Sequence, residues 1–371
     1  MKLLFFLSVF NLASGSVPHR RANNLTPTVS PNDTIINPAG GGTYPRLTHL
    51  TDGSVLAGFT AFSGTNGTTP TLTITRSTDG ARTFSAWGTV ASTTNDLDNI
   101  DLVQLANGDV VATFRNNDRI GSVGNYTYTY YRITACVSHD NGKTWAFLSQ
   151  VDERAASAVN NGLSEPYMRV TKGGALQVYY AAENSASDQD ILMRSSTDNG
   201  ATWSGTTTVA GGTTTGRDGM PGCTDLVTPA GAARVLCVFE TTEGTTPLFT
   251  VKSVMSADDG VSWGERSQVY IPVGTGKNAG APSVTTTTPA GTLVVSFMTD
   301  EDNSAVHKWP QGAAMKILTS LSTDPPNWGQ KTTVYGIPSF WPSVYRRVDG
   351  SGTVLGCADL GGVRCREISF A

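Results

Sequence analysis

The sequence has few charged residues, few histidines and almost no long apolar runs. Lys and Arg together number 26 in 371 residues against 30 Asp and Glu, and the formal net charge is −4. This balance argues against nucleic acid or an anionic membrane as a partner. The four histidines are widely separated, and neither a nucleophile-elbow serine nor a phosphate-binding glycine loop is present. We therefore expect no metal site and no cofactor.

The longest apolar run lies at the start of the chain. Leu3 to Phe10 follow Lys2 and precede small residues around Ala13 to Ser16, which is the pattern of a secretory signal peptide. No later segment approaches the roughly 20 apolar residues that a bilayer span needs. We expect residues 1–21 to hold the signal peptide and a short pro-segment trimmed after Arg20-Arg21, unless that pair is merely solvated. The mature protein, residues 22–371, is then a secreted, extracellular domain.

Five cysteines in an oxidising compartment leave one unpaired. Cys223 and Cys237 flank one predicted hairpin and Cys357 and Cys365 flank another, so we predict these two disulfides and a buried free thiol at Cys136. Four Asn-x-Thr sequons are candidate glycosylation sites on surface loops, namely Asn24, Asn32, Asn66 and Asn125.

The chain contains two interleaved repeats. In the first, Ser is followed by Asp after two residues, then by Gly, and by an aromatic residue five positions after the Asp; copies start at Ser77, Ser138, Ser196 and Ser256, with a degenerate one at Ser322. Asp and Gly suit a turn between strands, and the aromatic residue packs back between them. We interpret this box as a structural staple rather than a calcium site, because a lone carboxylate lacks the ligand count of calcium.

The second repeat is an apolar hairpin around a Gly turn, and it occurs six times. With Pro45, Asp101, Pro166, Pro221, Pro282 and Pro342 as equivalent starts, each unit spans about 60 residues, which fits one four-stranded blade. We predict an all-β, six-bladed β-propeller with box repeats. Three strands remain after Pro342, so a strand from roughly Thr28 to Asn37 should complete the last blade and close the ring.

In such a ring, polar residues at the ends of the inner strands face a central pocket. Glu165 begins one inner strand and Glu240 ends another, and two facing carboxyl groups are what glycosidases need. The alternative is that either glutamate forms a structural salt bridge with Arg115 or Arg217. Polar and aromatic candidates for sugar contacts, which could instead hold blades together or pack in the core, are Arg46, Asp101, Arg115, Asn116, Tyr179, Arg217, Asp218 and Trp341.

These segments carry a resemblance to known enzymes. The boxes resemble those of sialidases, and "NIDLVQLANGDVVATFRN", "LSEPYMRV", "QVYYAAEN", "RDGMPG" and "VFET" resemble segments of fungal exo-arabinanases of glycoside hydrolase family 93. The resemblance implies a retaining hydrolase that releases arabinobiose from the non-reducing end of α-1,5-L-arabinan, a neutral plant cell-wall polysaccharide. We expect the protein to be a monomer. By motif, Glu165 would be the nucleophile and Glu240 the acid/base, although sequence alone does not separate the two roles.

Two other readings stay open. A sialidase would carry Arg-Ile-Pro in its first blade, as part of a three-arginine clamp on a carboxylate, but the first blade here reads "YPRL". A non-catalytic carbohydrate-binding propeller would be favoured if Glu165 and Glu240 pointed away from one another, because the fold alone does not dictate function.

Overall fold

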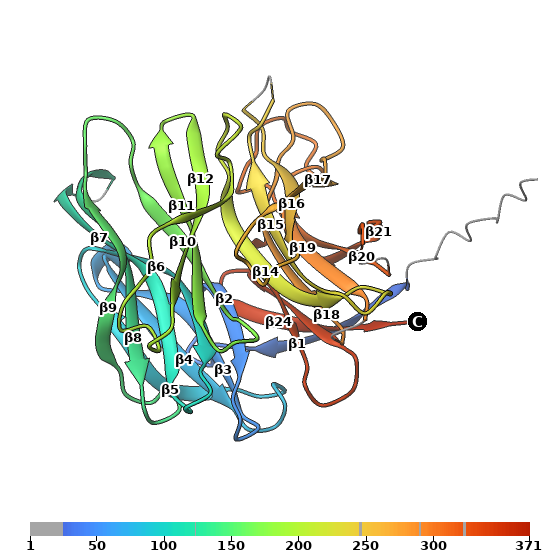
Figure 1. Cartoon of the computed structure of the whole chain (residues 1–371), viewed down its shortest axis with the longest axis horizontal. Coiled ribbons are helices and arrows are strands. Elements are labelled where there is room, and N and C mark those ends of the chain that lie inside the picture. Colours follow the sequence, from blue (N-terminus) through green and yellow to red (C-terminus); the bar gives the residue numbers. More distant parts are fainter. Residues whose placement is uncertain (1–24, 123, 245–246, 289–290, 322–323) are drawn as a thin grey trace, which may run out of the picture.

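The structure is a computed structural model that describes residues 25–122, 124–244, 247–288, 291–321 and 324–371. The signal-peptide prediction, the Asn24 sequon and the first residues of the degenerate repeat at Ser322 lie outside these residues. Six four-stranded antiparallel sheets surround a central axis, as the strand arrows of Figure 1 show. The predicted six-bladed all-β propeller is confirmed. No helix in the described part of the chain is long and apolar enough to cross a membrane.

Each of the first five blades takes four consecutive strands, ordered from the axis outwards. The first two blades consist of β2 (Thr43–His49), β3 (Val55–Ser63), β4 (Thr69–Ser77) and β5 (Ser85–Ser92), with the short 3-10 helix η1 (Thr65–Gly67), and of β6 (Asp96–Gln104), β7 (Val110–Ser122), β8 (Asn125–Ser138) and β9 (Ala146–Ala155). The third is formed by β10 (Leu163–Val170), β11 (Leu176–Ser185), β12 (Asp188–Ser196) and β13 (Thr207–Ala210). The fourth and fifth are β14 (Gly219–Val227), β15 (Ala233–Thr241), β16 (Thr250–Ser256) and β17 (Gly264–Tyr270), then β18 (Ala279–Thr286), β19 (Leu293–Thr299), β20 (Ala314–Ser320) and β21 (Gly329–Tyr335).

The sixth blade joins the two ends of the described chain. It contains β22 (Phe340–Arg346), β23 (Val354–Asp359), β24 (Val363–Phe370) and, as its outer strand, β1 (Pro27–Ile35). Figure 1 shows the blue β1 beside the red β24. Asp33 on β1 bonds Arg364 and Arg366 of β24 at 3.3 and 2.8 Å. The predicted closure by an N-terminal strand is therefore confirmed.

The core lies between blades rather than inside one of them. The second strands of the blades are apolar on both faces, as in β11, where Leu176 to Ala182 are all buried. Leu105, Val111 and Ile133 of the second blade pack against Val178 and Tyr180 of the third. Because every blade buries both faces against its neighbours, a second strand reads as a continuous apolar run instead of an alternating one.

The Ser-x-Asp box forms a closed set of hydrogen bonds at an outer turn of each of the first four blades. In the second blade, the Ser138 hydroxyl donates to Asp140 at 2.8 Å and accepts the backbone N–H of Gly142 at 2.8 Å. The Thr144 hydroxyl donates to the other Asp140 oxygen at 2.6 Å. The carboxylate is thus used within the turn, as a staple needs.

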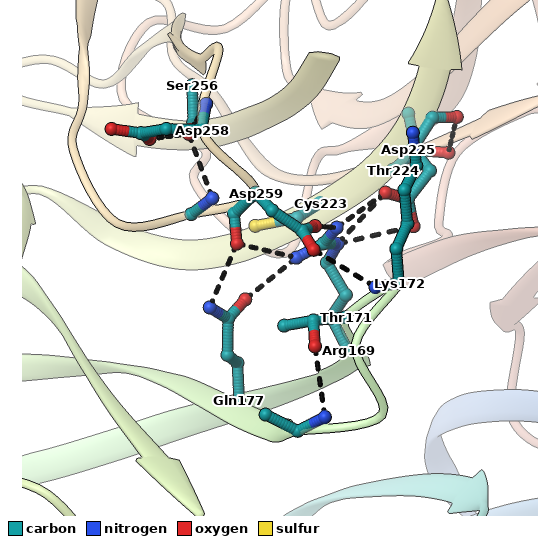
Figure 2. Close-up of polar contacts among 12 residues, drawn as sticks. Arg169, Thr171, Lys172, Gln177, Cys223, Thr224, Asp225, Ser256, Asp258 and Asp259 are labelled. Carbon is teal, nitrogen blue, oxygen red and sulfur yellow. Dashed lines mark hydrogen bonds and ion pairs between the residues drawn. The ribbon is translucent and has the colours of Figure 1, made fainter. Parts of the chain in front are cut away.

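A buried arginine links the third and fourth blades on the box side of the ring. Arg169 of β10 points towards Asp225 of β14 and towards Asp259 in the box of the fourth blade (Figure 2). It also donates to Gln177 at 2.8 Å, while the backbone N–H of Lys172 donates to Asp259 at 3.0 Å. The Arg169 side chain is 4% exposed. Two carboxylates and an amide oxygen accept the hydrogen bonds of the Arg169 guanidinium, so this buried arginine holds the two blades against each other.

Every innermost strand begins with the same β-bulge. In each blade one residue near the strand start has a positive φ of 48° to 61°, and the register to the second strand shifts there; these residues are Tyr44, Asn99, Glu165, Met220, Ala281 and Trp341. In five blades the next residue is proline, which favours an irregular strand start. In the second blade Ile100 takes that place. The start predicted for the second blade, Asp101, was therefore one residue too late. Ile100 is equivalent to the prolines of the other blades, and Asp101 is equivalent to Arg46 of the first blade.

Candidate active site

Four of the six bulge residues, Tyr44, Met220, Ala281 and Trp341, pack together at the axis. The hydroxyl of Tyr44 lies 3.9 Å from the sulfur of Met220, although the two residues belong to opposite blades. Tyr44, Met220 and Ala281 form an apolar cluster with Met298, Trp309 and Trp341. We call this cluster the axial plug. Two cavities with no lining residue in common lie on its two sides. The first is lined by residues that follow the bulges, and the second contains Glu165 and Glu240.

The second cavity has a volume of about 300 Å³ and a mainly polar wall. Blades two, three and four supply its lining, which is Arg115, Asn117, Tyr128, Tyr131, Asn160, Gly162, Ser164, Glu165, Glu183, Gln189, Arg217, Glu240 and Phe249. A space of this size, with convergent polar groups, is typical of a small-ligand site.

Glu165 is itself the bulge residue of the third blade. Its φ of 61° is unfavourable for a residue with a side chain, so the surrounding structure has to hold it there. One contact that does so is the backbone N–H of Met220, which donates a 2.7 Å hydrogen bond to Oε2 of Glu165. Met220 is the bulge residue of the next blade, so two neighbouring bulges fix one carboxyl group.

Glu240 reaches the same space from the end of β15, opposite Gly219 on β14. The backbone N–H of Ala281 donates a 2.6 Å hydrogen bond to its Oε2. Ala281 is the bulge residue of the fifth blade. Each glutamate is therefore bound by the bulge N–H of the following blade, and this repeated arrangement turns both carboxyl groups towards the axis.

Two glycines leave room for the carboxyl groups. A Cβ atom on Gly219 would lie 3.1 Å from Oε2 of Glu165 and 3.6 Å from Oε1 of Glu240, so the two side chains face one another across one backbone position. A Cβ atom on Gly280 would overlap Oε2 of Glu240 and would lie 3.2 Å from the ring of Trp309. Neither glycine has a positive φ. They are needed here for close approach rather than for backbone freedom.

The environment makes the two carboxyl groups different. Burial and, to a smaller extent, the nearby charge of Glu165 raise the pKa of Glu240 to about 8, while the Ala281 N–H and the positive charge of Arg217 oppose the shift. Burial also raises the pKa of Glu165, but the Met220 N–H and the positive charges of Arg115 and Arg217 act against it. The cationic surroundings therefore favour the ionised form of Glu165 and the protonated form of Glu240.

The arginines of the cavity have other partners. Arg115 lies 3.0 Å from Asp96 and 3.7 Å from Asp98, whereas Arg217 donates to Glu183 and Gln189 at 2.7 Å each. Within the described residues, neither Glu165 nor Glu240 forms an ion pair with a cationic side chain. The structural salt bridge considered from the sequence is thus absent from this part of the chain, and the two glutamates face each other instead of pointing apart.

The structure brings only some of the predicted sugar-contact residues into this cavity. Arg115 and Arg217 line it, and Trp341 belongs to the axial plug. Arg46 and Asp101 lie on the far side of the plug, in the other axial cavity. They follow the bulge in their strands, whereas Glu165 forms it, and this difference in register separates them from the glutamates.

The side chains of the other three candidates, Asn116, Tyr179 and Asp218, contact protein groups in their own or a neighbouring blade. Asn116 donates to Thr134 at 3.2 Å. The Tyr179 hydroxyl donates to Gln177 at 2.7 Å, and its ring packs edge-on against Trp263. Asp218 has no exposed surface and is bound by Arg266 at 2.7 Å. Asp218 directly precedes β14 as expected, whereas Asn116 and Tyr179 lie within β7 and β11, and none of the three lines the cavity.

Several cavity residues were not among the predicted sites. Glu183 and Gln189 bind Arg217, and Tyr128 and Tyr131 form an aromatic wall. Asp96, which does not itself line the cavity, binds Arg115. Glu183 does end an apolar strand, as Glu240 does, which is the signal that could have found it. The backbone donors of Met220 and Ala281 have no signal in residue type. Among the described residues, no group of three or more His, Cys, Asp or Glu could hold a metal ion.

The cysteine pairs and sequons can also be placed. The structure contains the disulfides Cys223–Cys237, between β14 and β15, and Cys357–Cys365, between β23 and β24, while Cys136 is free and buried. The first disulfide joins the strand of Gly219 to the strand of Glu240. Asn32 and Asn125 are exposed, as glycan acceptors must be.

Comparisons with known proteins agree with the fold. No protein-family model and no curated protein sequence matches the chain. Among solved structures, it is similar to the family 93 α-L-arabinofuranosidase of Fusarium graminearum in complex with arabinobiose, with a TM-score of 0.68, 19% identity, and coverage of 91% of this chain and 96% of that one. It is likewise similar to the α-L-arabinanase of Penicillium chrysogenum complexed with arabinobiose, with a TM-score of 0.67, 18% identity, and coverage of 92% and 98%.

A more distant similarity extends to the NanB sialidase of Streptococcus pneumoniae, with a TM-score of 0.54 and 10% identity over 91% of this chain and 70% of that one. At such identities the likeness establishes the architecture. The chain has the six-bladed propeller fold shared by these arabinan-active enzymes and sialidases.

Proposed function

We propose that this protein is a secreted, monomeric glycoside hydrolase that acts on α-1,5-linked L-arabinan and releases arabinobiose from the non-reducing end with retention of configuration. The observation that carries this proposal is the pair of partly buried carboxyl groups, Glu165 and Glu240, which face one another across Gly219 in unequal electrostatic surroundings. The arabinan substrate is supported by the similar structures, two of which hold arabinobiose.

The unequal pair assigns the two roles. Glu240, protonated near neutral pH, donates its proton to the departing glycosidic oxygen while the Glu165 carboxylate attacks the anomeric carbon. The glycosidic bond breaks as a glycosyl–Glu165 ester forms. Glu240, now ionised, then takes a proton from water, whose oxygen attacks the anomeric carbon and frees Glu165. Close carboxyl groups favour this route over an inverting one, which needs room for water between them.

The paired arginines favour a neutral substrate. Arg115 and Arg217 already bind Asp96 and Glu183, so each has a carboxylate partner within the protein and can offer its remaining N–H donors to sugar hydroxyls. A sialic-acid carboxylate would bring a further negative charge close to the Glu165 carboxylate. This arrangement weighs against the sialidase alternative.

The deciding experiment is a digest of linear α-1,5-arabinan with the purified protein, followed by chromatography of the early products and by proton NMR of the newly formed anomer. Arabinobiose alone, released first as the retained anomer, is the expected result. A ladder of longer products would contradict the exo mode, and the inverted anomer would contradict Glu165 as nucleophile. Absence of cleavage would overturn the proposal and direct the assay to sialosides and glycan-binding arrays.

A further inference from the structure

The second blade carries an extension beside the candidate active site. Pairing of β6 with β7 ends at Asn117, and pairing of β9 with β8 starts at Tyr130. Beyond these points β7 and β8 pair only with each other, as far as Ser122 and Asn125. We call this part of the hairpin, residues 118–122 and 124–129, the tyrosine arm. At about 3.3 Å per residue, its five residues on β7 span roughly 16 Å beyond the last pairing of β7 with β6.

The register of the arm determines which side chains face the cavity. Asp118 pairs with Tyr130 and Arg119 with Tyr128, so β8 has one extra residue at Thr129. A bulge of this kind reverses the alternation of side chains. Tyr128 therefore shares a face with Tyr131, and the two rings lie 5.4 Å apart in the cavity wall. Two residues further along the strand, Tyr126 lies on that same face.

The arm is fixed in place at its base. The Tyr128 hydroxyl donates to Asp96 at 3.4 Å, and Arg119 donates to the backbone oxygen of Asn95 at 3.0 Å. The guanidinium of Arg119 lies over the ring of Tyr126, 3.8 Å from its centroid. A free two-stranded hairpin is marginally stable, so these contacts keep the tyrosine face in a defined orientation.

Tyr130 points away from this face. Its ring is covered by Arg132, at 4.4 Å, and Arg132 in turn binds Asp118 at 2.8 Å. An arginine covers one side of the ring in both Tyr126 and Tyr130, so the two tyrosines differ in the face of the hairpin on which they lie. Only the face of Tyr126 is shared with the cavity residues Tyr128 and Tyr131. This difference supplies a matched control within a single element.

We propose that Tyr131, Tyr128 and Tyr126 form a track that binds the polysaccharide chain beyond the sugars held between Glu165 and Glu240. Half-buried tyrosines in a row offer flat apolar faces to sugar rings and hydroxyl groups to their oxygens. The inference rests on the proposed function, because it assigns a polymer rather than a short oligosaccharide as the preferred substrate of that site.

The test compares two substrates in three proteins. kcat/KM is measured on linear arabinan and on arabinotriose for the unmodified chain, for Tyr126→Ala and for Tyr130→Ala. We expect the ratio of the two values, polymer over trisaccharide, to fall roughly tenfold in Tyr126→Ala, equivalent to about 1.4 kcal/mol of lost binding, and to stay unchanged in Tyr130→Ala. Thermal unfolding checks that both variants are folded.

An unchanged ratio in Tyr126→Ala, or an equal fall in both variants, would overturn the proposal. If the unmodified protein cleaves neither substrate, the proposed function itself fails, and the track is then tested by electrophoresis through gels that contain arabinan or galactan. Retardation of the unmodified protein and Tyr130→Ala, but not of Tyr126→Ala, would support the track. Equal mobility of all three proteins in these gels would refute it.

Discussion

At the scale of single residues, the candidate site depends on small differences between two glutamates. Both are partly buried and each accepts one bulge N–H. Arg217 acts on both, whereas Arg115 acts on Glu165 and the charge of Glu165 raises the pKa of Glu240. Their roles therefore follow from the surroundings and not from the residue type.

This difference predicts the pH dependence of activity. Glu240 has to be protonated to act as the acid, so kcat/KM on arabinan should fall as the pH rises above about 8. Glu165 has to be ionised, so activity should also fall at low pH. An aryl arabinobioside whose leaving group needs no proton should lose the alkaline limb, and Glu240→Gln should still form the glycosyl intermediate from it. An alkaline limb that persists with the aryl substrate would contradict Glu240 as the acid.

Gly219 gives a second prediction at this scale. A methyl group there would lie 2.8 Å from Nε2 of Gln189 and 3.1 Å from Oε2 of Glu165, so Gly219→Ala should displace the carboxyl group. We expect kcat/KM to fall about 100-fold, since small displacements of a reacting group have effects of that size. Gly205→Ala is the control, because a Cβ atom there has no neighbour within 4 Å. Equal activity of the two variants would show that the close approach is unimportant.

At the scale of strands and turns, the box turns, the doubly buried strands and the bulges explain which features of the fold and of the candidate site could be predicted from the sequence. The box and hairpin periods predicted the blades because each blade repeats the same turn chemistry and the same doubly buried strand. Glu165 and Glu240 were singled out because a carboxyl group at the start or the end of an apolar strand is costly to bury unless it has a partner. Arg46 and Asp101 were misplaced because a bulge, which only the pairing register reveals, separates them from the cavity.

The box turns predict how stability depends on pH. Hydrogen bonds from Thr144 and Ser138 lower the pKa of Asp140 to about 2, below its value of about 3.9 in an unfolded chain. A lowered pKa contributes stability above the unfolded value, and this contribution is lost as the pH falls through the folded value. Asp140→Asn should therefore lower the free energy of unfolding by about 1 kcal/mol at pH 6 and by much less at pH 2. Urea unfolding followed by tryptophan fluorescence measures both; an equal loss at the two pH values would contradict this account.

At the scale of the whole molecule, the stability of the ring depends on the pairing of β1 with β24 in the sixth blade. Five blades are formed by consecutive strands, but the sixth needs β1, from the other end of the described chain, to cover β24. The interblade cores depend on each sheet being held against two neighbours. Loss of one outer strand should then affect the cooperativity of the entire ring rather than a single blade.

Two changes test this dependence on β1. Removal of residues 1–36 deletes the outer strand and the fully buried Ile36, and it leaves β24 as an open edge that favours aggregation. We expect this chain to lose its single thermal transition, whereas a chain that begins at Leu25 keeps β1 and should retain it. Asp33→Ala is milder, because it removes only the bonds to Arg364, Arg366 and the Tyr335 hydroxyl, and should lower Tm by a few degrees. A shortened chain that still unfolds in one transition at the original Tm would mean that five complete blades and a three-stranded sixth suffice, and that β1 does not close the ring in energetic terms.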